Sequence, residues 1–330
     1  MSLILAGDIG GTKTLLAIFK SQNNGKLEEL CKKSYPSNSY TNFNSLLKNF
    51  ISEHSSLADK VITATFGVAG PVLDQRCMTT KLPWIINAIE ISNEFQIPNV
   101  HLLNDLEATA YGILTLNHFH SLNPNAQEKS GHFSVIAAGT GLGEVTVFFD
   151  GREYHTMPSE GGHCDFAPQT PLEDQLIAFL RNRFKGHVSM DRILSGDGFG
   201  NLYDFLKSIN FAPVNPPLEE RMKQEDRNAV ISHAGLHNED PLCTEVMKLF
   251  CRIYGAEAGN LALKALPFGG IYIAGGIAKK IRPALESGIF MEGFLDKGRL
   301  SHSIEHIPIR LVDNEEAPLL GAANFASKQI

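Results

Sequence analysis

The chain has 330 residues, of which 43% are hydrophobic and 20% are charged, and its 29 basic and 36 acidic side chains give a formal net charge of −7. This composition is typical of a packed globular protein, and the length predicts about two domains. Because nucleic acids and anionic membranes bind clustered cations, we expect this acidic chain to bind neither. It has no run of about 18 apolar residues and no basic segment before Asp8, so we expect neither a membrane span nor a secretory signal.

The five cysteines are sparse and odd in number, and no two of them form a C-x-x-C pair. Disulfide frameworks and cysteine-based zinc sites both depend on regularly spaced cysteines. We therefore expect reduced thiols in a cytoplasmic protein, with neither a disulfide nor a zinc site.

The first part of the chain alternates apolar strands with glycine turns and amphipathic helices. Residues 3–6 and 14–19 are apolar on either side of a glycine-rich turn, which predicts a strand, a tight turn and a second strand. Between residues 43 and 51, apolar side chains recur at the spacing of one helix face. The further elements that we expect here are a turn at Asn23-Asn24-Gly25, strands at 61–68 and 100–103, and a helix at 106–116.

The second part opens in the same way, with apolar strands at 133–138 and 145–149 around another glycine turn. We interpret the two openings as a weak internal duplication with one copy in each domain, and we place the boundary near 104–116. Strands that alternate with helices predict the α/β class. The further elements that we expect are helices at 172–184, 201–206, 218–227, 242–266 and 317–328, a linker at 214–217 and a strand at 271–274.

Three glycine clusters each follow an apolar strand: Gly7-Asp8-Ile9-Gly10-Gly11-Thr12, Gly139-Thr140-Gly141-Leu142-Gly143 and Gly275-Gly276. Glycine lets backbone N–H groups turn toward a phosphate chain with no Cβ in the way, and a neighbouring threonine adds a hydroxyl donor. Ordinary tight turns are the alternative for any one cluster, whereas three together favour a nucleotide site. A Walker-type P-loop and a strand followed by G-x-G-x-x-G are both missing, so a Rossmann dehydrogenase is not expected.

Two aspartates accompany these strand ends. Phosphates beside the first cluster would repel Asp8 unless a divalent cation such as Mg²⁺ lay between them, often through water; a turn aspartate bonded to its own backbone is the alternative. Asp105 follows a strand at the edge where open α/β sheets bind ligands. It is suited to accept the proton of a hydroxyl that attacks a γ-phosphate. An N-cap of the next helix is the competing interpretation, which spacing alone favours.

A third dense cluster lies at 159–168. Glu160 and His163 flank two glycines, so both side chains can converge on a small polar ligand such as a sugar, whose hydroxyls pair with carboxylates and imidazoles. A structural loop is one alternative. Metal ligation is another, although Glu-x-x-His on a glycine loop lacks the helical scaffold of a di-iron site. We interpret Trp84, the only tryptophan, as a core residue rather than a sugar platform.

Taken together, these motifs resemble those of the bacterial ATP-dependent glucokinases, the hexokinase-like group that is distinct from the ROK kinases. They run in order along essentially the whole chain. The matching stretches are GDIGGTKT (7–14), FGVAGPV (66–72), TKLPW (80–84), LLNDLEATAYGI (102–113), GTGLG (139–143), EGGHCDFAP (160–168), RILSGDGFGNLY (192–203), GGIYIAGGIA (269–278), FLDKGR (294–299) and LLGAA (319–323).

The resemblance implies an actin-like ATPase (ribonuclease H-like) fold of two α/β domains around a cleft. Residues 1–110 with 317–330 would form the smaller domain and 111–316 the larger, and the C-terminal helix would return to the smaller one. It also implies that the γ-phosphate of ATP, with Mg²⁺, passes to the 6-hydroxyl of D-glucose. Finally, it implies that the protein is a homodimer in the cytoplasm and that its product enters glycolysis.

The resemblance also implies roles for single residues. Asp105 matches the catalytic base, and Asn104, Glu160 and His163 match glucose ligands. Gly7 to Thr12 and Gly139 to Gly143, including Thr140 and Gly141, match the phosphate loops, and Gly275-Gly276 lie near the adenosine.

One position departs from the family. Asp191 stands where the family has a glutamate that reaches the anomeric side of the sugar, and aspartate is about 1.5 Å shorter. A hexose kinase with another sugar preference therefore stays open. A non-catalytic sugar-sensing protein is the other alternative, but the strand at 3–6 leaves no room for the N-terminal helix-turn-helix of such relatives.

Overall fold

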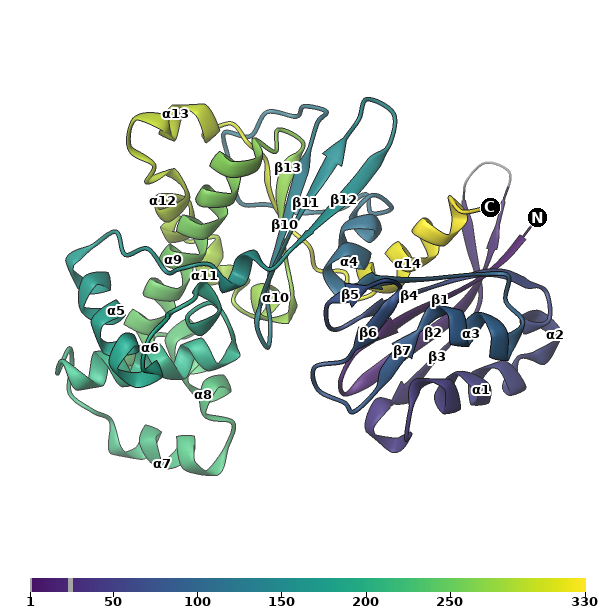
Figure 1. Ribbon diagram of the computed structural model, residues 1–330. Helices are drawn as coiled ribbons and strands as arrows, with labels where there is room; N and C mark the ends of the chain where they lie inside the picture. The colour runs from purple at the N-terminus through teal and green to yellow at the C-terminus, as the bar shows by residue number, and fades with distance from the viewer. Residues whose placement is uncertain (1, 23–25) are drawn as a thin grey trace. The chain divides into compact units, whose positions relative to one another are not determined.

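A computed structural model describes residues 2–22 and 26–330, so the turn predicted at Asn23-Asn24-Gly25 lies outside the described residues. The chain divides into two compact units, each of which combines helices with a sheet (Figure 1). Unit 1 is Met1–His118 with Asn314–Ile330, and unit 2 is Phe119–Asp313. The α/β class is thereby confirmed. In the ranges described, none of the helices combines the length and the apolar character needed to cross a bilayer.

The boundaries of the units differ by a few residues from those of the predicted domains. A boundary at 110/111 would cut the helix α4 (Asp105–Ile113), which carries the chain past that position. At the other boundary, Glu316 already belongs to unit 1, because Lys32 Nζ lies 2.9 Å from its carboxylate. Unit 1 therefore resumes at Asn314 instead of 317.

A five-stranded sheet of order β3-β2-β1-β4-β8 forms the centre of unit 1. Strands β3, β2 and β1 are antiparallel neighbours, whereas β4 and β8 run parallel to β1. The strands of unit 1 are β1 (Ser2–Ile9), β2 (Lys13–Ser21), β3 (Leu27–Pro36), β4 (Val61–Val68), β8 (Asn99–Asn104) and, in a small antiparallel sheet, β5 (Val72–Leu73), β6 (Arg76–Met78) and β7 (Ile85–Asn87).

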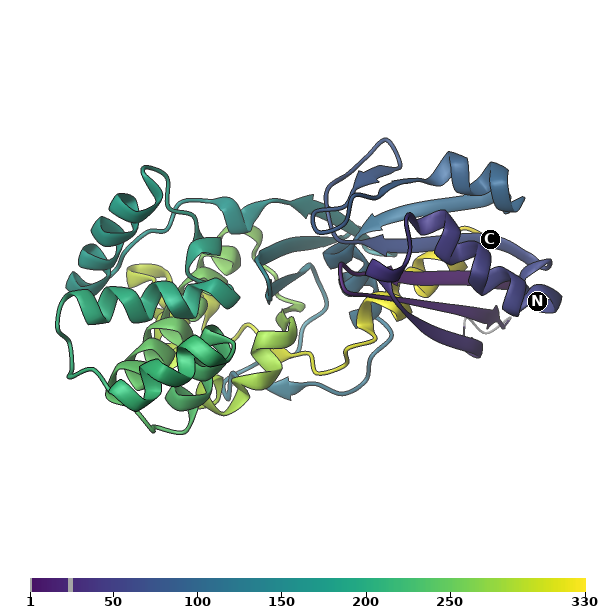
Figure 2. The ribbon, with the colours of Figure 1, turned by 90° about the horizontal axis from the view of Figure 1, so that it is seen from below.

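Helices cover both faces of this sheet, as Figures 1 and 2 show. Side chains alternate along a strand, so Leu5 packs toward α1 while its neighbours Ile4 and Ala6 pack toward α14. The apolar stripe predicted at 43–51 lies buried in α1, and Trp84, which is 1% exposed, is a core residue as predicted. The helices of unit 1 are η1 (Ser37–Ser39), α1 (Phe43–Glu53), α2 (Ser55–Ala58), α3 (Ala88–Phe95), α4 (Asp105–Ile113) and α14 (Ala317–Ser327).

Helix α14 packs directly against α4 through two glycines. A Cβ on Gly321 would overlap the carbonyl oxygen of Ala108, and one on Gly112 would overlap that of Ala317. Only glycine allows this approach, because any side chain would push the two backbones apart. The C-terminal helix is therefore an integral part of unit 1.

Unit 2 repeats the arrangement of unit 1. Its six-stranded sheet has the order β12-β11-β10-β13-β14-β9, in which β12, β11 and β10 are antiparallel and β13 and β14 run parallel to β10. Three antiparallel strands followed by two parallel ones thus occur in both units, as the predicted duplication requires. The strands are β9 (His120–Ser121), β10 (Phe133–Ala138), β11 (Leu142–Phe149), β12 (Tyr154–Ser159), β13 (Gly270–Ala274) and β14 (Ile309–Leu311).

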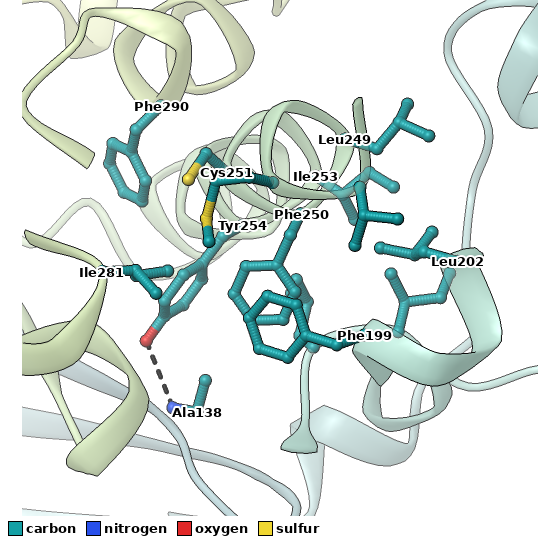
Figure 3. Packing of buried hydrophobic residues seen from close by; sticks show 14 of the residues in the cluster. Ala138, Phe199, Leu202, Leu249, Phe250, Cys251, Ile253, Tyr254, Ile281 and Phe290 are labelled. Carbon is teal, nitrogen blue, oxygen red and sulfur yellow. Dashed lines mark hydrogen bonds between the residues drawn. The ribbon is translucent and has the colours of Figure 1, made fainter. Parts of the chain in front are cut away.

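The long helix α9 organises the core of unit 2 (Figure 3). Phe250 stacks on Phe199 of α6 with ring centroids 4.4 Å apart, and Tyr254 Oη accepts a hydrogen bond from Ala138 N at 3.2 Å. The helices are η2 (Gly161–His163), α5 (Pro171–Phe184), η3 (Met190–Arg192), α6 (Gly196–Ser208), α7 (Pro216–Gln224), α8 (Arg227–Leu236), α9 (Pro241–Ala265), α10 (Gly276–Lys280), α11 (Arg282–Leu285), α12 (Ile289–Leu295), η4 (Gly298–Leu300) and α13 (Ser301–Ile304).

Two predictions in unit 2 were wrong. The supposed linker at 214–217 contains the start of α7, because Pro216 and Pro217 occupy the first turn, where a missing N–H costs no hydrogen bond. The helix expected at 218–227 ends at Gln224, and α8 follows after Asp226.

Candidate active site

The first glycine cluster forms the end of β1 and its turn into β2. Gly10 N donates to Lys13 O at 3.0 Å, which closes the turn. Ser37, just beyond β3, supports it from the side: its hydroxyl donates to Gly10 O at 2.8 Å and its N–H donates to Thr12 O at 2.9 Å. Sequence reasoning missed Ser37, because a single serine far along the chain gives no local signal of this contact.

Asp8 lies within β1, level with Leu15 of β2 and Gly67 of β4, and not in the turn. The alternative of a turn aspartate bonded to its own backbone is therefore wrong. Burial raises the pKa of Asp8 to about 7, the charge of Asp105 raises it as well, and Lys13 lowers it. A cation stabilises a carboxylate that a second carboxylate opposes. These residues therefore fit a divalent metal ion such as Mg²⁺, which takes oxygen ligands.

Asp105 is the first residue of α4, and its neighbour Asn104 is the N-cap. Asn104 Oδ1 accepts a hydrogen bond from Leu106 N at 2.9 Å, and the Glu107 carboxylate accepts one from Asn104 N at 3.1 Å, which completes a capping box. The capping role thus belongs to Asn104. The half-buried Asp105 carboxylate lies at the helix N-terminus, where the helix dipole favours negative charge, and its Oδ1 accepts from Leu106 N at 2.9 Å.

Parallel strands bring Asp8 and Asp105 to the same edge of the sheet. Asp8 is level with Gly67 of β4, and Gly67 is level with Leu103 of β8, two residues before Asp105. A Cβ on Gly67 would lie 4.0 Å from Asp105 Cα and 2.8 Å from the side chain of Ala108, so glycine lets α4 pack closely here. This carboxyl edge is where open α/β sheets bind ligands.

Asn104 also holds the loop that follows β4. Its Nδ2 donates to Gly70 O at 3.0 Å while its Oδ1 caps α4. An amide has two N–H groups and two acceptor lone pairs, so one of each is left for a ligand such as a sugar hydroxyl. The structural and binding roles of Asn104 are therefore compatible.

The second glycine cluster forms the turn between β10 and β11 in unit 2. Gly139 N donates to Gly141 O at 2.8 Å, and Gly196 N, at the start of α6, donates to Gly139 O at 2.9 Å. Asp191 contacts the same turn, because its Oδ1 accepts a hydrogen bond from Leu142 N at 2.7 Å. The residue predicted to reach the sugar therefore supports the predicted phosphate loop.

Glu160 and His163 are both exposed and lie on either side of two glycines in the short helix η2. A Cβ on Gly162 would overlap the carbonyl oxygen of Leu142, and one on Gly161 would overlap the carboxyl group of Glu144. The glycines therefore let this segment lie directly against the start of β11. The structure thus brings Glu160 and His163 to the second glycine cluster.

Gly275 lies between β13 and α10, and Gly276 is the first residue of α10. Strand β13 is the parallel neighbour of β10. A pocket of about 340 Å³ opens beside α10, within the ~300–1,000 Å³ typical of ligand sites. Its walls come from α6, α8 and α10 and include Phe199, Ala229 and Ile277. Sequence reasoning missed this pocket because it did not predict α8.

A pair of buried carboxyl groups lies beneath the second glycine cluster. Glu144 of β11 is 4% exposed and Glu257 of α9 is 2% exposed. Burial raises the pKa of Glu144 to about 8, and the charge of Glu257 raises it as well, while Lys264 lowers it. Because each buried carboxyl group opposes the ionisation of the other, we expect one of the two to keep a proton. The sequence signal was an acidic residue directly after the second glycine cluster, and it was not used.

The structure thus groups the predicted residues in two sets. Unit 1 carries Gly7 to Thr12 with Asn104 and Asp105 at the carboxyl edge of its sheet. The second set, around the β10–β11 turn of unit 2, comprises Gly139, Thr140, Gly141, Glu160, His163, Asp191, Gly275 and Gly276.

Comparisons with known proteins agree on one family. A family model described as Glucokinase matches residues 5–329. A glucokinase of Nostoc sp. is 36% identical over 99% of this chain and 100% of its own length. A glucokinase of Synechocystis sp. is 39% identical over 98% of each chain.

Solved structures with the same fold are also sugar kinases. A glucokinase from an Antarctic psychrotroph has a TM-score of 0.86 at 26% identity and covers 99% of both chains. A ROK family glucokinase from Streptomyces griseus, in complex with glucose and AMPPNP, has a TM-score of 0.60 and covers 99% of this chain and 100% of its own. At 18% identity, the second comparison shows the fold alone. The fold is that of the actin-like ATPases.

Proposed function

This chain belongs to the glucokinase family, and from that premise we propose that it transfers the γ-phosphoryl group of ATP to the 6-hydroxyl group of D-glucose, with Asp105 as the general base. The observation that carries the assignment of the base is the position of Asp105 at the N-terminus of α4, close enough to Asp8 to affect its ionisation. The presence of Asp8, Asp105, Glu160 and His163 argues against a non-catalytic sugar-sensing protein.

The surroundings of the Asp105 carboxylate suit a general base. The helix dipole and the hydrogen bond from Leu106 N both stabilise the ionised carboxylate, which can then accept the proton of the attacking hydroxyl. Phosphoryl transfer needs mainly positioning and charge stabilisation from the protein, so one oriented carboxylate is sufficient.

We assign the nucleotide to the glycine turns and to the pocket beside α10. The turns at Gly10–Thr12 and Gly139–Gly141 would bind the phosphates, and the pocket would hold the purine base next to Gly275-Gly276. Asp8 would hold Mg²⁺ through water, and the ion would neutralise the phosphate charge. Glu160, His163 and Asn104 would bind the sugar hydroxyls. We expect a homodimer that works in the cytoplasm, at the entry to glycolysis.

A panel of hexoses assayed with MgATP tests this proposal. We expect glucose to give the highest kcat/KM, ahead of mannose, galactose and glucosamine, with ADP formed only when a hexose is present. Turnover of another hexose ahead of glucose would instead support the alternative sugar preference. The Asp191→Glu variant carries the glutamate that the glucokinase family has at this position. If the order of kcat/KM among the hexoses changes in this variant, residue 191 contributes to the sugar preference.

Filling the pocket tests the assignment of the purine base. Ala229→Trp places a large ring where Ala229 lines the pocket, and we expect the KM for ATP to rise about tenfold while the KM for glucose stays the same, because a tenfold change needs only about 1.4 kcal/mol of lost binding. Asn182→Trp, on the exposed side of α5, is the control that adds the same ring away from the pocket. An unchanged KM for ATP in Ala229→Trp would contradict the assignment.

A further inference from the structure

The end of α8 and the turn that follows it bring together three exposed side chains: His233, His237 and Glu239. One ligand atom of each lies within 4.8 Å of the other two. Within the described ranges, these residues are the one such group of histidine, cysteine and carboxylate side chains. Their chemistry is that of a site for a transition metal ion, since imidazole and carboxylate together suit Zn²⁺.

The backbone holds the three residues in place. His233 and His237 are one helical turn apart, so their rings lie side by side with centroids 4.2 Å apart. Asn238 then adopts a left-handed conformation with φ of 55°, and Glu239 N donates to Ala234 O at 2.9 Å. This pattern is a Schellman motif, which turns the chain back over the end of the helix. Glu239 therefore returns to the side of the two histidines.

The hydrogen bonding of His237 leaves a ligand atom available. Its Nδ1 lies 2.9 Å from the carbonyl oxygen of His233, an acceptor, so Nδ1 carries the proton and Nε2 carries the lone pair. Metal-binding histidines are commonly held in this way, with the second ring nitrogen donating to a backbone carbonyl. The same bond fixes the orientation of the ring.

The spacing of the other two ligands also fits an ion. His233 Nδ1 and Glu239 Oε1 are 3.8 Å apart, which is too long for a hydrogen bond. Two ligands bound at about 2.1 Å to one tetrahedral ion are about 3.4 Å apart, so a small side-chain rotation would close the site. Exposed side chains can rotate in this way at little cost.

We propose that His233, His237 and Glu239 form a binding site for a divalent transition metal ion, with Zn²⁺ as the occupant. The three ligands come from the last helical turn of α8 and the residues just after it, and water would complete the coordination. Mg²⁺ does not compete, because it prefers oxygen ligands. The sequence predicts no zinc site built from cysteines, and the site proposed here contains no cysteine, because its ligands are two histidines and a glutamate. It lies at the rim of the pocket beside α10, which His233 also lines.

Isothermal titration calorimetry of the metal-free full chain with ZnCl₂ tests the proposal, and visible absorption of bound Co²⁺ reports the ligand field. We expect one ion per chain, and we expect His237→Ala and Glu239→Gln each to weaken binding at least tenfold. MgCl₂ should give no binding at this site. All three side chains are exposed, so the variants should keep the wild-type circular dichroism spectrum.

Two controls distinguish this site from other metal-binding side chains. His302→Ala removes an exposed histidine elsewhere, and Cys164→Ser removes an exposed thiol, and both should bind Zn²⁺ as the wild type does. Equal Zn²⁺ affinity in the wild type, His237→Ala and Glu239→Gln would overturn the proposal, as would loss of binding in Cys164→Ser. Neither result would affect the proposed kinase function, because the variants change His237, Glu239 and Cys164, which have no part in it, and leave His233 in the pocket wall unchanged.

Discussion

Replacing Asp105 by asparagine is expected to lower kcat about 10²- to 10⁴-fold, because the amide cannot accept the proton of the sugar hydroxyl. Asparagine has nearly the same shape as aspartate, and its Oδ1 can still accept the hydrogen bond from Leu106 N. We therefore expect the KM values for ATP and glucose to change little. A coupled assay of ADP formation measures both quantities.

The folded state of this variant should be nearly as stable as the wild type. Asn104 supplies the N-cap of α4, so the helix keeps its start when Asp105 changes. Glu107→Gln is the matched control, since it makes the same carboxylate-to-amide change two residues later and should leave kcat close to that of the wild type. An Asp105→Asn enzyme with near wild-type kcat and an unchanged thermal midpoint would refute the assignment of the base.

Replacing Glu144 by glutamine is expected to stabilise the protein at alkaline pH, by up to roughly 5 kcal/mol near pH 8.5. The pKa of Glu144 is raised by burial, and by the charge of Glu257, from an ordinary value of 4.5 to about 8. Between these two values the folded chain binds a proton that the unfolded chain has released. The free energy of unfolding of the wild type therefore falls as the pH rises through this window. Glutamine imitates the protonated acid and removes this loss.

Glu144→Ala is a control variant that we expect to destabilise the protein. It removes the partner of Glu257 and leaves that carboxylate buried with Asn260 Nδ2 at 2.9 Å and Lys264 Nζ at 3.8 Å. The cavity left by removing a large buried side chain costs roughly 3 kcal/mol. Urea unfolding at several pH values measures all three proteins. Parallel pH curves for the wild type and Glu144→Gln would show that the two carboxyl groups do not share a proton.

Strands bounded by glycine turns could be predicted almost to the residue, whereas an edge strand could not. The strand expected at 61–68 is β4 (Val61–Val68), because an unbroken apolar run of that length between turns is typical of a buried strand. The edge strand β3 (Leu27–Pro36) was missed. Most of its side chains are exposed and several are charged, as in edge strands that must avoid pairing with other chains.

The helices of unit 2 show a similar limit. The break between α7 and α8 depends on Asp226, whose carboxylate accepts hydrogen bonds from Asn228 N at 3.0 Å and from Ala229 N at 3.2 Å. An aspartate within a charged helical segment gives no clear sign of whether it caps a helix or lies inside one. Because this break was not predicted, neither was α8, and the pocket wall that α8 forms could not be anticipated.

In the candidate site, roles that depend on neighbouring residues could be predicted from the sequence, whereas roles that depend on contacts between distant residues could not. The convergence of Asp8 and Asp105 could be predicted, because both follow from parallel strands that end at one edge. The glutamate three residues after Asn104 was a usable sign that Asn104, and not Asp105, caps α4. Ser37 and Glu257 act on parts of the chain far from them in sequence, so no local pattern points to their roles.

The position of α14 has a consequence for the order of folding during synthesis. Residues 319–326 cover one face of the first sheet, where Ile4, Ala6 and Phe19 are otherwise apolar and uncovered. The ribosome makes these strands first and the helix that covers them last, whereas unit 2 is made from one continuous segment. Unit 2 can therefore complete its core while the earlier-made strands still expose an apolar face, and surface of this kind favours aggregation until the last helix covers it.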